Sequence, residues 1–151
     1  MTIAKNKTGK VRKSKAQPKK ATIVITYNSV ENFPAGTYEG KNGPVIIYSN
    51  DNTYTWSREA ENKLGQVLHQ IYGKTDEKDV GKVYLYVGSY AKEGALRAAR
   101  KYSDAGKNLT LVACSCDSGL KERTAQEIGA PIIWSECGGR RKLSEIVKGL
   151  M

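Results

Sequence analysis

Three short apolar runs, each followed by a segment with helical periodicity, decide the fold: VYLYVGS (83–89) with KEGALRAARKY (92–102), TLVACSC (110–116) with LKERTAQEIG (120–129), and PIIWSEC (131–137) with RRKLSEIVKGL (140–150). Buried strands that alternate with helices are typical of parallel βαβ units. Gly129 followed by Pro131 predicts the end of the second helix. We therefore predict an α/β domain with three layers, α-β-α, around a mostly parallel sheet.

The N-terminal half has weaker signals. ATIVITYNSV (21–30) and PVIIYSN (44–50) are rich in β-branched residues and predict two strands, joined by a turn-rich connection at 31–43. Their nearness in sequence favours an antiparallel β-hairpin. TYTW (53–56) predicts a short further strand, and a helix is expected from Ser57 to Gly73, followed by a charged loop at 74–82.

From residue 83 onward the order of elements resembles that of Rossmann-like and flavodoxin-like domains. The resemblance is architectural and implies no particular activity. It does imply that a ligand would bind at the carboxyl ends of the parallel strands. The sequence contains neither the GxGxxG dinucleotide fingerprint nor the GxxxxGK[ST] phosphate loop.

Positive charge is concentrated at the N-terminus. The formal net charge is +10, from 25 Lys and Arg against 15 Asp and Glu. Residues 1–20 contain no acid and eight bases, namely Lys5, Lys7, Lys10, Arg12, Lys13, Lys15, Lys19 and Lys20. Because this segment has little apolar surface to bury, we predict a disordered basic tail at 1–20 and a single α/β domain at 21–151.

The cysteine content and hydropathy indicate an intracellular protein. Three cysteines do not suggest a disulfide framework. The N-terminus lacks the apolar core of a signal peptide, and no apolar run is long enough to cross a membrane. The expected location is the cytoplasm, or the nucleus in a eukaryote, and not the secretory route or the membrane.

Basic residues outside the tail suggest phosphate contacts. A helix start preceded by two glycines can present backbone N–H groups to an anion, and cations on a neighbouring helix face can extend such a surface. The candidate residues are Gly138, Gly139, Arg140, Arg141 and Lys142 at the last helix, with Arg97, Arg100 and Lys101 on the first helix of the 83–151 stretch.

The carboxyl ends of the predicted strands supply a possible ligand pocket. Its residues are Gly88, Ser89, Tyr90, Ser115, Asp117, Ser118 and Glu136. Asp117 also suits the N-cap of the following helix, and Glu136 can balance the basic cluster beside it. Both carboxylates are alternatives as magnesium ligands or acid–base groups.

The three cysteines, Cys114, Cys116 and Cys137, end two neighbouring strands and could converge. Three thiolates with Asp117 or His69 would suit zinc. However, the CxC spacing differs from the usual CxxC and no second pair follows, so buried apolar cysteines and no metal are the prediction. With one histidine, catalytic residues are not identified, no cofactor is predicted, and enzymatic activity is left open.

Three functions fit these patterns. The first is a nucleic-acid-binding protein, for DNA or RNA, with a basic arm and a fixed anion site on the last helix. The second is a small-ligand domain that binds or turns over a phosphorylated or nucleotide compound at the strand ends. The third is a structural or assembly protein whose tail binds another polyanion.

Overall fold

The structure, a computed structural model, describes residues 20–49, 80–89, 92–101 and 108–151. Its strands are β1 (Ala21–Ile25), β2 (Gly36–Gly40), β3 (Gly43–Tyr48), β4 (Val80–Val87), β5 (Leu109–Cys114) and β6 (Ile132–Ser135). The described helices are α2 (Lys92–Lys101), α3 (Ser118–Ile128) and α4 (Arg140–Leu150). The strands form one six-stranded sheet in the order β2-β3-β1-β4-β5-β6.

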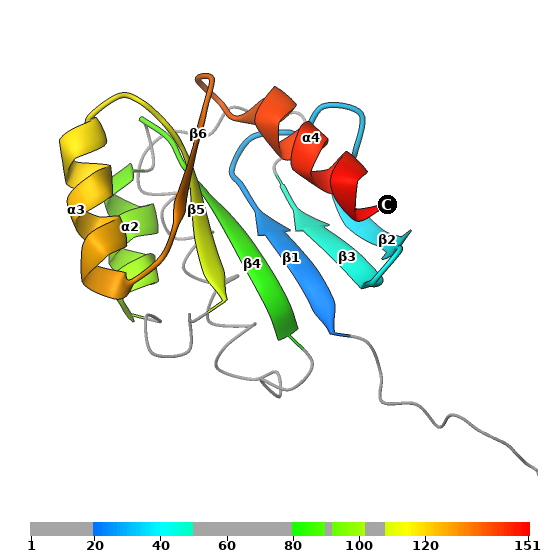
Figure 1. The fold of residues 1–151 in the computed structure, drawn as a ribbon. Helices are drawn as coiled ribbons and strands as arrows, with labels where there is room; N and C mark the ends of the chain where they lie inside the picture. The colour runs from blue at the N-terminus through cyan, green and yellow to red at the C-terminus, as the bar shows by residue number, and fades with distance from the viewer. Residues whose placement is uncertain (1–19, 50–79, 90–91, 102–107) are drawn as a thin grey trace, which may run out of the picture.

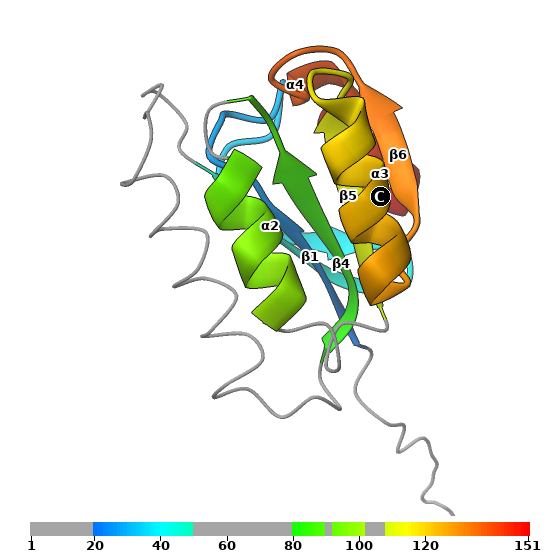
Figure 2. The ribbon, with the colours of Figure 1, turned by 90° about the vertical axis from the view of Figure 1, so that its left-hand side faces the viewer.

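The helices lie on both faces of this sheet. Figure 1 shows α2 and α3 against one face and α4 against the other, and Figure 2 shows the same arrangement with α2 and α3 in front. The predicted three-layer α/β architecture is therefore confirmed, and so are the positions of the strands and helices from residue 83 onward.

The sheet is parallel except at one edge. β1 pairs with β3 and β4, β4 with β5, and β5 with β6, all in parallel. The antiparallel hairpin expected in the N-terminal part exists, but its strands are β2 and β3. The direct pairing of the first predicted strand with the second is parallel, which corrects that part of the expectation. A parallel pair needs a crossover, and the connection between β1 and β3 contains the additional strand β2.

The core lies between the sheet and its helices. All six residues of β5 are buried, as expected for a central strand covered on both faces. Leu143 and Val147 of α4 and Leu96 of α2 are completely buried. Each such side chain contributes about 1.5–3 kcal/mol of transfer free energy, so both helix layers are fixed firmly to the sheet.

Several expectations concern segments that lie outside the described residues, and one expected boundary differs in the structure. The strand at 53–56, the helix at 57–73 and most of the basic tail lie outside the described residues. Of the charged loop predicted at 74–82, residues 74–79 lie outside the described residues, and residues 80–82 belong to β4, which corrects that part of the expectation.

The end of α3 brings β6 beside β5. Gly129 adopts a left-handed conformation, with φ 71°, and its N–H and that of Ala130 bond to carbonyls of the last helical turn. This is the Gly–Pro helix stop expected from the sequence. The chain then returns through Pro131 into β6, which pairs with β5 in register from Leu111↔Ile132 to Cys114↔Ser135.

Candidate functional site

The register between β5 and β6 places two cysteines at equivalent positions. Cys114 is paired with Ser135 at the carboxyl end of the two strands. Cys116 and Cys137 each follow two residues later, in the loops before α3 and α4. Since neighbouring parallel strands run about 4.8 Å apart, Cys116 and Cys137 leave the sheet side by side.

The three cysteines form one cluster. The Sγ atoms of Cys114, Cys116 and Cys137 all lie within 4.8 Å of one another, and in the described part of the chain no other group of His, Cys, Asp or Glu side chains is gathered in this way. Cys114 is buried, with 2% of its surface exposed, whereas Cys116 and Cys137 are exposed. The expectation of three buried apolar cysteines is therefore wrong for two of them.

Lys121 contacts the cluster at its buried member, Cys114. It lies one turn into α3, its side chain is completely buried, and its ammonium donates hydrogen bonds to the carbonyl oxygen of Cys114 at 2.8 Å and to Cys114 Sγ at 3.4 Å. A buried lysine needs a partner of this kind, because an isolated ammonium is costly to desolvate. Sequence reasoning missed Lys121, since a lysine within a helix is ordinarily exposed.

The surroundings of Cys114 favour its thiolate. Burial raises the pKa, but this is outweighed by hydrogen bonds from Ser89 Oγ and the Cys116 backbone and by the charge of Lys121, so the pKa of Cys114 falls to about 7. The pKa of Cys137 is raised, because the neighbouring sulphurs of Cys114 and Cys116 disfavour another negative charge. A negative charge in the metal-free cluster is therefore favoured at Cys114, beside Lys121, and disfavoured at Cys137.

Tyr86 supports the loop that carries Cys137. Its hydroxyl accepts a hydrogen bond of 2.8 Å from the backbone N–H of Gly138, and its ring lies against Tyr27, with centroids 5.8 Å apart. Gly139 approaches this ring so closely that an added Cβ would lie 2.5 Å from it. Burial raises the pKa of Tyr86 above its usual value, so the hydroxyl is neutral and fixes the loop by hydrogen bonding.

Asp117 is held by Lys92 and does not cap α3 with its side chain. It occupies the N-cap position in a left-handed conformation, with φ 53°, and makes no side-chain capping bond. Its carboxylate instead forms an ion pair with the ammonium of Lys92 at the start of α2, which lowers the pKa of Asp117. The expected capping role is therefore wrong for the side chain, although its carbonyl accepts the first backbone bonds of α3.

The basic cluster at α4 is already engaged with the protein. Glu136 Oε2 accepts a hydrogen bond of 2.6 Å from the backbone N–H of Arg141 and lies 3.8 Å from its Nε. Arg140 Nε donates to Ser29 Oγ at 2.8 Å, and Lys142 pairs with Glu145. An anion at this helix start would have to displace Glu136, so the anion site stays a prediction.

The basic residues of α2 also have partners within the fold. Arg100 bonds to Glu127 and Thr124 of α3, each at 2.9 Å, which joins the two helices on this face of the sheet. Arg97 and Lys101 are exposed and also have interactions. The phosphate-binding role predicted for these three residues stays a prediction.

Some of the remaining predicted site residues lie at the strand ends, and the others lie outside the residues that the structure describes. Ser89 and Ser115 are exposed beside the cysteines, and Gly88 is buried against Tyr27 and Tyr86. Ser118 opens α3. Tyr90, His69 and the basic residues up to Lys19 lie outside the described residues, while Lys20 is exposed.

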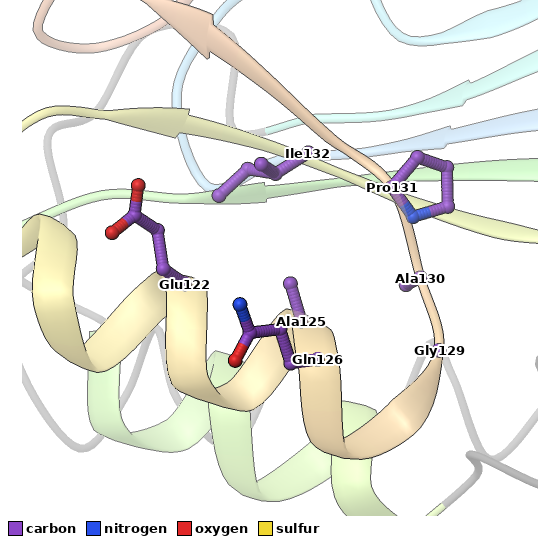
Figure 3. A pocket seen from close by; sticks show the side chains of 7 residues that line it. All are labelled: Glu122, Ala125, Gln126, Gly129, Ala130, Pro131 and Ile132. Atoms are coloured by element: carbon purple, nitrogen blue, oxygen red, sulfur yellow. The ribbon is translucent and has the colours of Figure 1, made fainter.

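A hollow of about 620 Å³ lies elsewhere, between the second half of α3 and the beginning of β6. Figure 3 shows its lining residues, which are Glu122, Ala125, Gln126, Gly129, Ala130, Pro131 and Ile132. Because Ile132 begins β6, this hollow is near the amino edge of the sheet, whereas the cysteines lie at the carboxyl edge. Its lining is mostly apolar and has no thiol, so it is separate from the candidate site.

Comparisons with known proteins do not assign a family. No protein-family model and no curated protein matches the sequence. Among solved structures, the chain is similar to the FeoB G-domain from Methanococcus jannaschii, with 15% identity and a TM-score of 0.44, over 86% of this chain and 95% of that one. A likeness of this degree carries no argument about activity.

Within the described residues, no helix has the length and apolar character needed to cross a bilayer.

Proposed function

We propose that this protein binds a divalent soft metal ion, with Zn²⁺ as the reference ion, through the thiolates of Cys114, Cys116 and Cys137. The observation that carries the proposal is the convergence of the three Sγ atoms within 4.8 Å at the carboxyl edge of the sheet. Zinc–sulphur bonds of about 2.3 Å in a tetrahedral site separate the sulphurs by about 3.8 Å. The cluster would therefore need to contract by no more than about 1 Å.

Charge balance supports a divalent ion. Three thiolates carry three negative charges, and the buried ammonium of Lys121, which contacts Cys114 Sγ, compensates one of them. A divalent cation would neutralise the other two, whereas a monovalent ion would leave a net negative charge. Thiolate ligands in turn select zinc and similar soft ions over magnesium or calcium.

The burial of Cys114 favours a ligand role over a nucleophilic role. A reactive cysteine combines a lowered pKa with access for its substrate. In this cluster the cysteine whose pKa is lowered is the buried one, Cys114, at 2% exposure. A buried thiolate that is ionised near neutral pH is suited to be the inner ligand of a metal ion. Cys116 and Cys137, in the exposed loops, would supply the outer ligands.

The fourth coordination position would be taken by solvent or another small donor. Among the described residues, no carboxylate or imidazole joins the three sulphurs, and Asp117 and Glu136 are engaged with Lys92 and Arg141. Three protein ligands with one open position are typical of zinc sites that accept a ligand. The proposal thus keeps the small-ligand hypothesis at the same strand ends, with a metal as the recognition group.

Binding of nucleic acid by the N-terminal basic segment is a separate proposal that rests on the sequence. Eight bases without an acid in residues 1–20 would neutralise phosphates without reading their sequence. Lys20, which the structure describes, is exposed beside β1.

Titration of the reduced protein with Co²⁺ tests the metal proposal. Co²⁺ bound by thiolates gives a sulphur-to-metal charge-transfer absorption and intense visible bands in tetrahedral geometry. The full chain should show these bands with one equivalent of metal, and Cys114→Ser, Cys116→Ser and Cys137→Ser should each weaken them. Ser115→Ala, a change between two of the ligands, is the matched control and should bind as the unmodified chain does. Absence of the charge-transfer band, or its persistence in all three cysteine variants, would overturn the proposal.

A further inference from the structure

We infer that Cys116 and Cys137 form a reversible disulfide, that Cys114 remains reduced, and that this disulfide switches metal binding off. The statement about metal release rests on the proposed function. The statement about the disulfide rests only on the placement of the three thiols, so the two can be tested separately.

The strand register makes Cys116 and Cys137 the natural pair. They lie two residues beyond the paired residues Cys114 and Ser135, in the loops that follow two neighbouring parallel strands. The strands from which these loops leave are about 4.8 Å apart, and a disulfide spans about 4.4–6.8 Å between Cα atoms. Their Sγ atoms lie within 4.8 Å of each other, and both side chains are exposed and reachable by an oxidant.

Cys114 is protected from the same reaction by its position. It is 2% exposed and ends a fully buried strand. Its Sγ receives a hydrogen bond from Lys121 and lies 3.7 Å from Ser89 Oγ.

The chemistry requires a two-electron oxidant, for which a hydroperoxide is the chemical class. The thiolate of one exposed cysteine attacks the O–O bond of hydrogen peroxide, which gives a sulfenic acid and releases hydroxide. The thiol of the other cysteine then attacks the sulfenic sulphur and loses its proton, and the sulfenic oxygen leaves as water. The two thiols lose two electrons and two protons in total, while one molecule of peroxide is reduced to two of water.

Disulfide formation would remove two of the three metal ligands together. Only Cys114 would remain, still contacted by Lys121. One thiolate with one adjacent ammonium has no excess negative charge to hold a divalent ion. A thiol reductant would reverse the bond and restore the site.

Disulfide mapping on the full, metal-free, reduced chain tests the first statement. After hydrogen peroxide treatment and blocking of free thiols with N-ethylmaleimide, trypsin should yield peptide 108–121 linked to peptide 124–140. Fragmentation on either side of Ser115 should place the blocking group on Cys114 and the link on Cys116. Cys114→Ser should still form the bond, whereas Cys116→Ser and Cys137→Ser should not. A link through Cys114, or oxidation of the exposed pair to sulfinic acids without a link, would overturn the inference.

Release of Zn²⁺ from the loaded, full chain tests the second statement. Peroxide should release the metal in parallel with disulfide formation, and reductant should restore binding. Retention of the metal by the disulfide form would overturn the switch. If the reduced chain takes up no Zn²⁺ while the Cys116–Cys137 bond still forms, the proposed metal function fails and the disulfide stands.

Discussion

The ammonium of Lys121 lies 3.4 Å from Cys114 Sγ, although the side chain of Lys121 is completely buried. This contact joins the first turns of α3 to the carboxyl end of β5. It also stabilises the negative charge of Cys114 on the protein side of the thiol cluster. This buried contact acts together with the hydrogen bonds from Ser89 and the Cys116 backbone, which also favour the thiolate.

The stability of the metal-free, reduced protein should depend on pH through Cys114. The folded-state pKa of Cys114, about 7, is lower than the ordinary value of 9.0. Ionised Cys114 therefore stabilises the folded state fully when the pH is above 9.0, the pKa of the thiol in the unfolded chain. This stabilisation is lost as the pH falls through about 7. Two pKa units correspond to about 2–3 kcal/mol of unfolding free energy. Urea unfolding across this pH range should show the rise, and Cys114→Ala should remove most of it.

Lys121→Met should weaken that pH dependence. Methionine has an unbranched side chain, as lysine does, but it carries no charge and cannot donate a hydrogen bond to Cys114. The pKa of Cys114 should therefore return toward its ordinary value. The unfolding free energy should then rise less between neutral and alkaline pH than in the unmodified chain. Lys148→Met, at an exposed position in α4, is the control. Equal pH dependence in both variants would show that Lys121 does not stabilise the thiolate.

Gly139→Ala should destabilise the loop that carries Cys137. The left-handed conformation of Gly139, with φ 68°, costs about 1–2 kcal/mol for other residues, and the added Cβ would contact the Tyr86 ring at 2.5 Å. Gly149→Ala is the matched control, since no atom lies within 4 Å of its added Cβ. That change should stabilise α4 by about 0.5 kcal/mol. Thermal unfolding should separate the variants, and equal melting temperatures would contradict the packing described around Tyr86.

Glu136→Ala should strengthen phosphate binding at the start of α4. The change frees the Arg141 N–H that Glu136 occupies at 2.6 Å and removes a competing negative charge. A charge-assisted hydrogen bond is worth about 1.5–3 kcal/mol, so calorimetry with inorganic phosphate should show affinity higher by on the order of tenfold. Glu122→Ala, at an exposed glutamate of α3 on the other face of the sheet, is the control. If phosphate binds no better to Glu136→Ala than to the control, this helix start is not an anion site.

Removal of residues 1–20 tests the nucleic-acid proposal. With eight bases in that segment, the full chain should bind mixed-sequence DNA or RNA with an affinity that falls steeply as salt rises. The shortened chain should bind weakly and with a flatter salt dependence. An unchanged salt dependence would place any nucleic-acid contact on the folded domain.

The fold from residue 83 onward was predictable because each strand there is a short apolar run in the sequence and because α2 and α4 each bury an apolar face. Leu143 and Val147, both completely buried, show how directly the spacing of α4 specifies its packing. The topology of β1 and β3 was not predictable in the same way. Which strands pair depends on contacts across the whole sheet and not on neighbouring residues alone. β2 is mostly exposed, is bounded by glycines and has no apolar alternation from which it could be predicted.

The site was only partly readable from the sequence. Cys116 lies in the turn two residues after the end of β5, and Cys137 occupies the equivalent place after β6. That equivalence becomes visible only once the strand register is known. The burial of Lys121 had no local signal, because it depends on how the first turns of α3 lie against the end of β5.

X-ray absorption spectroscopy at the zinc edge of the Zn²⁺-loaded, reduced chain would identify the atoms bound to the metal. We expect three sulphur neighbours at about 2.3 Å and one lighter neighbour at about 2.0–2.2 Å. In Cys137→Ser the number of sulphur neighbours should fall to two. A first shell made only of nitrogen and oxygen would contradict the claim that the three thiols form the metal site.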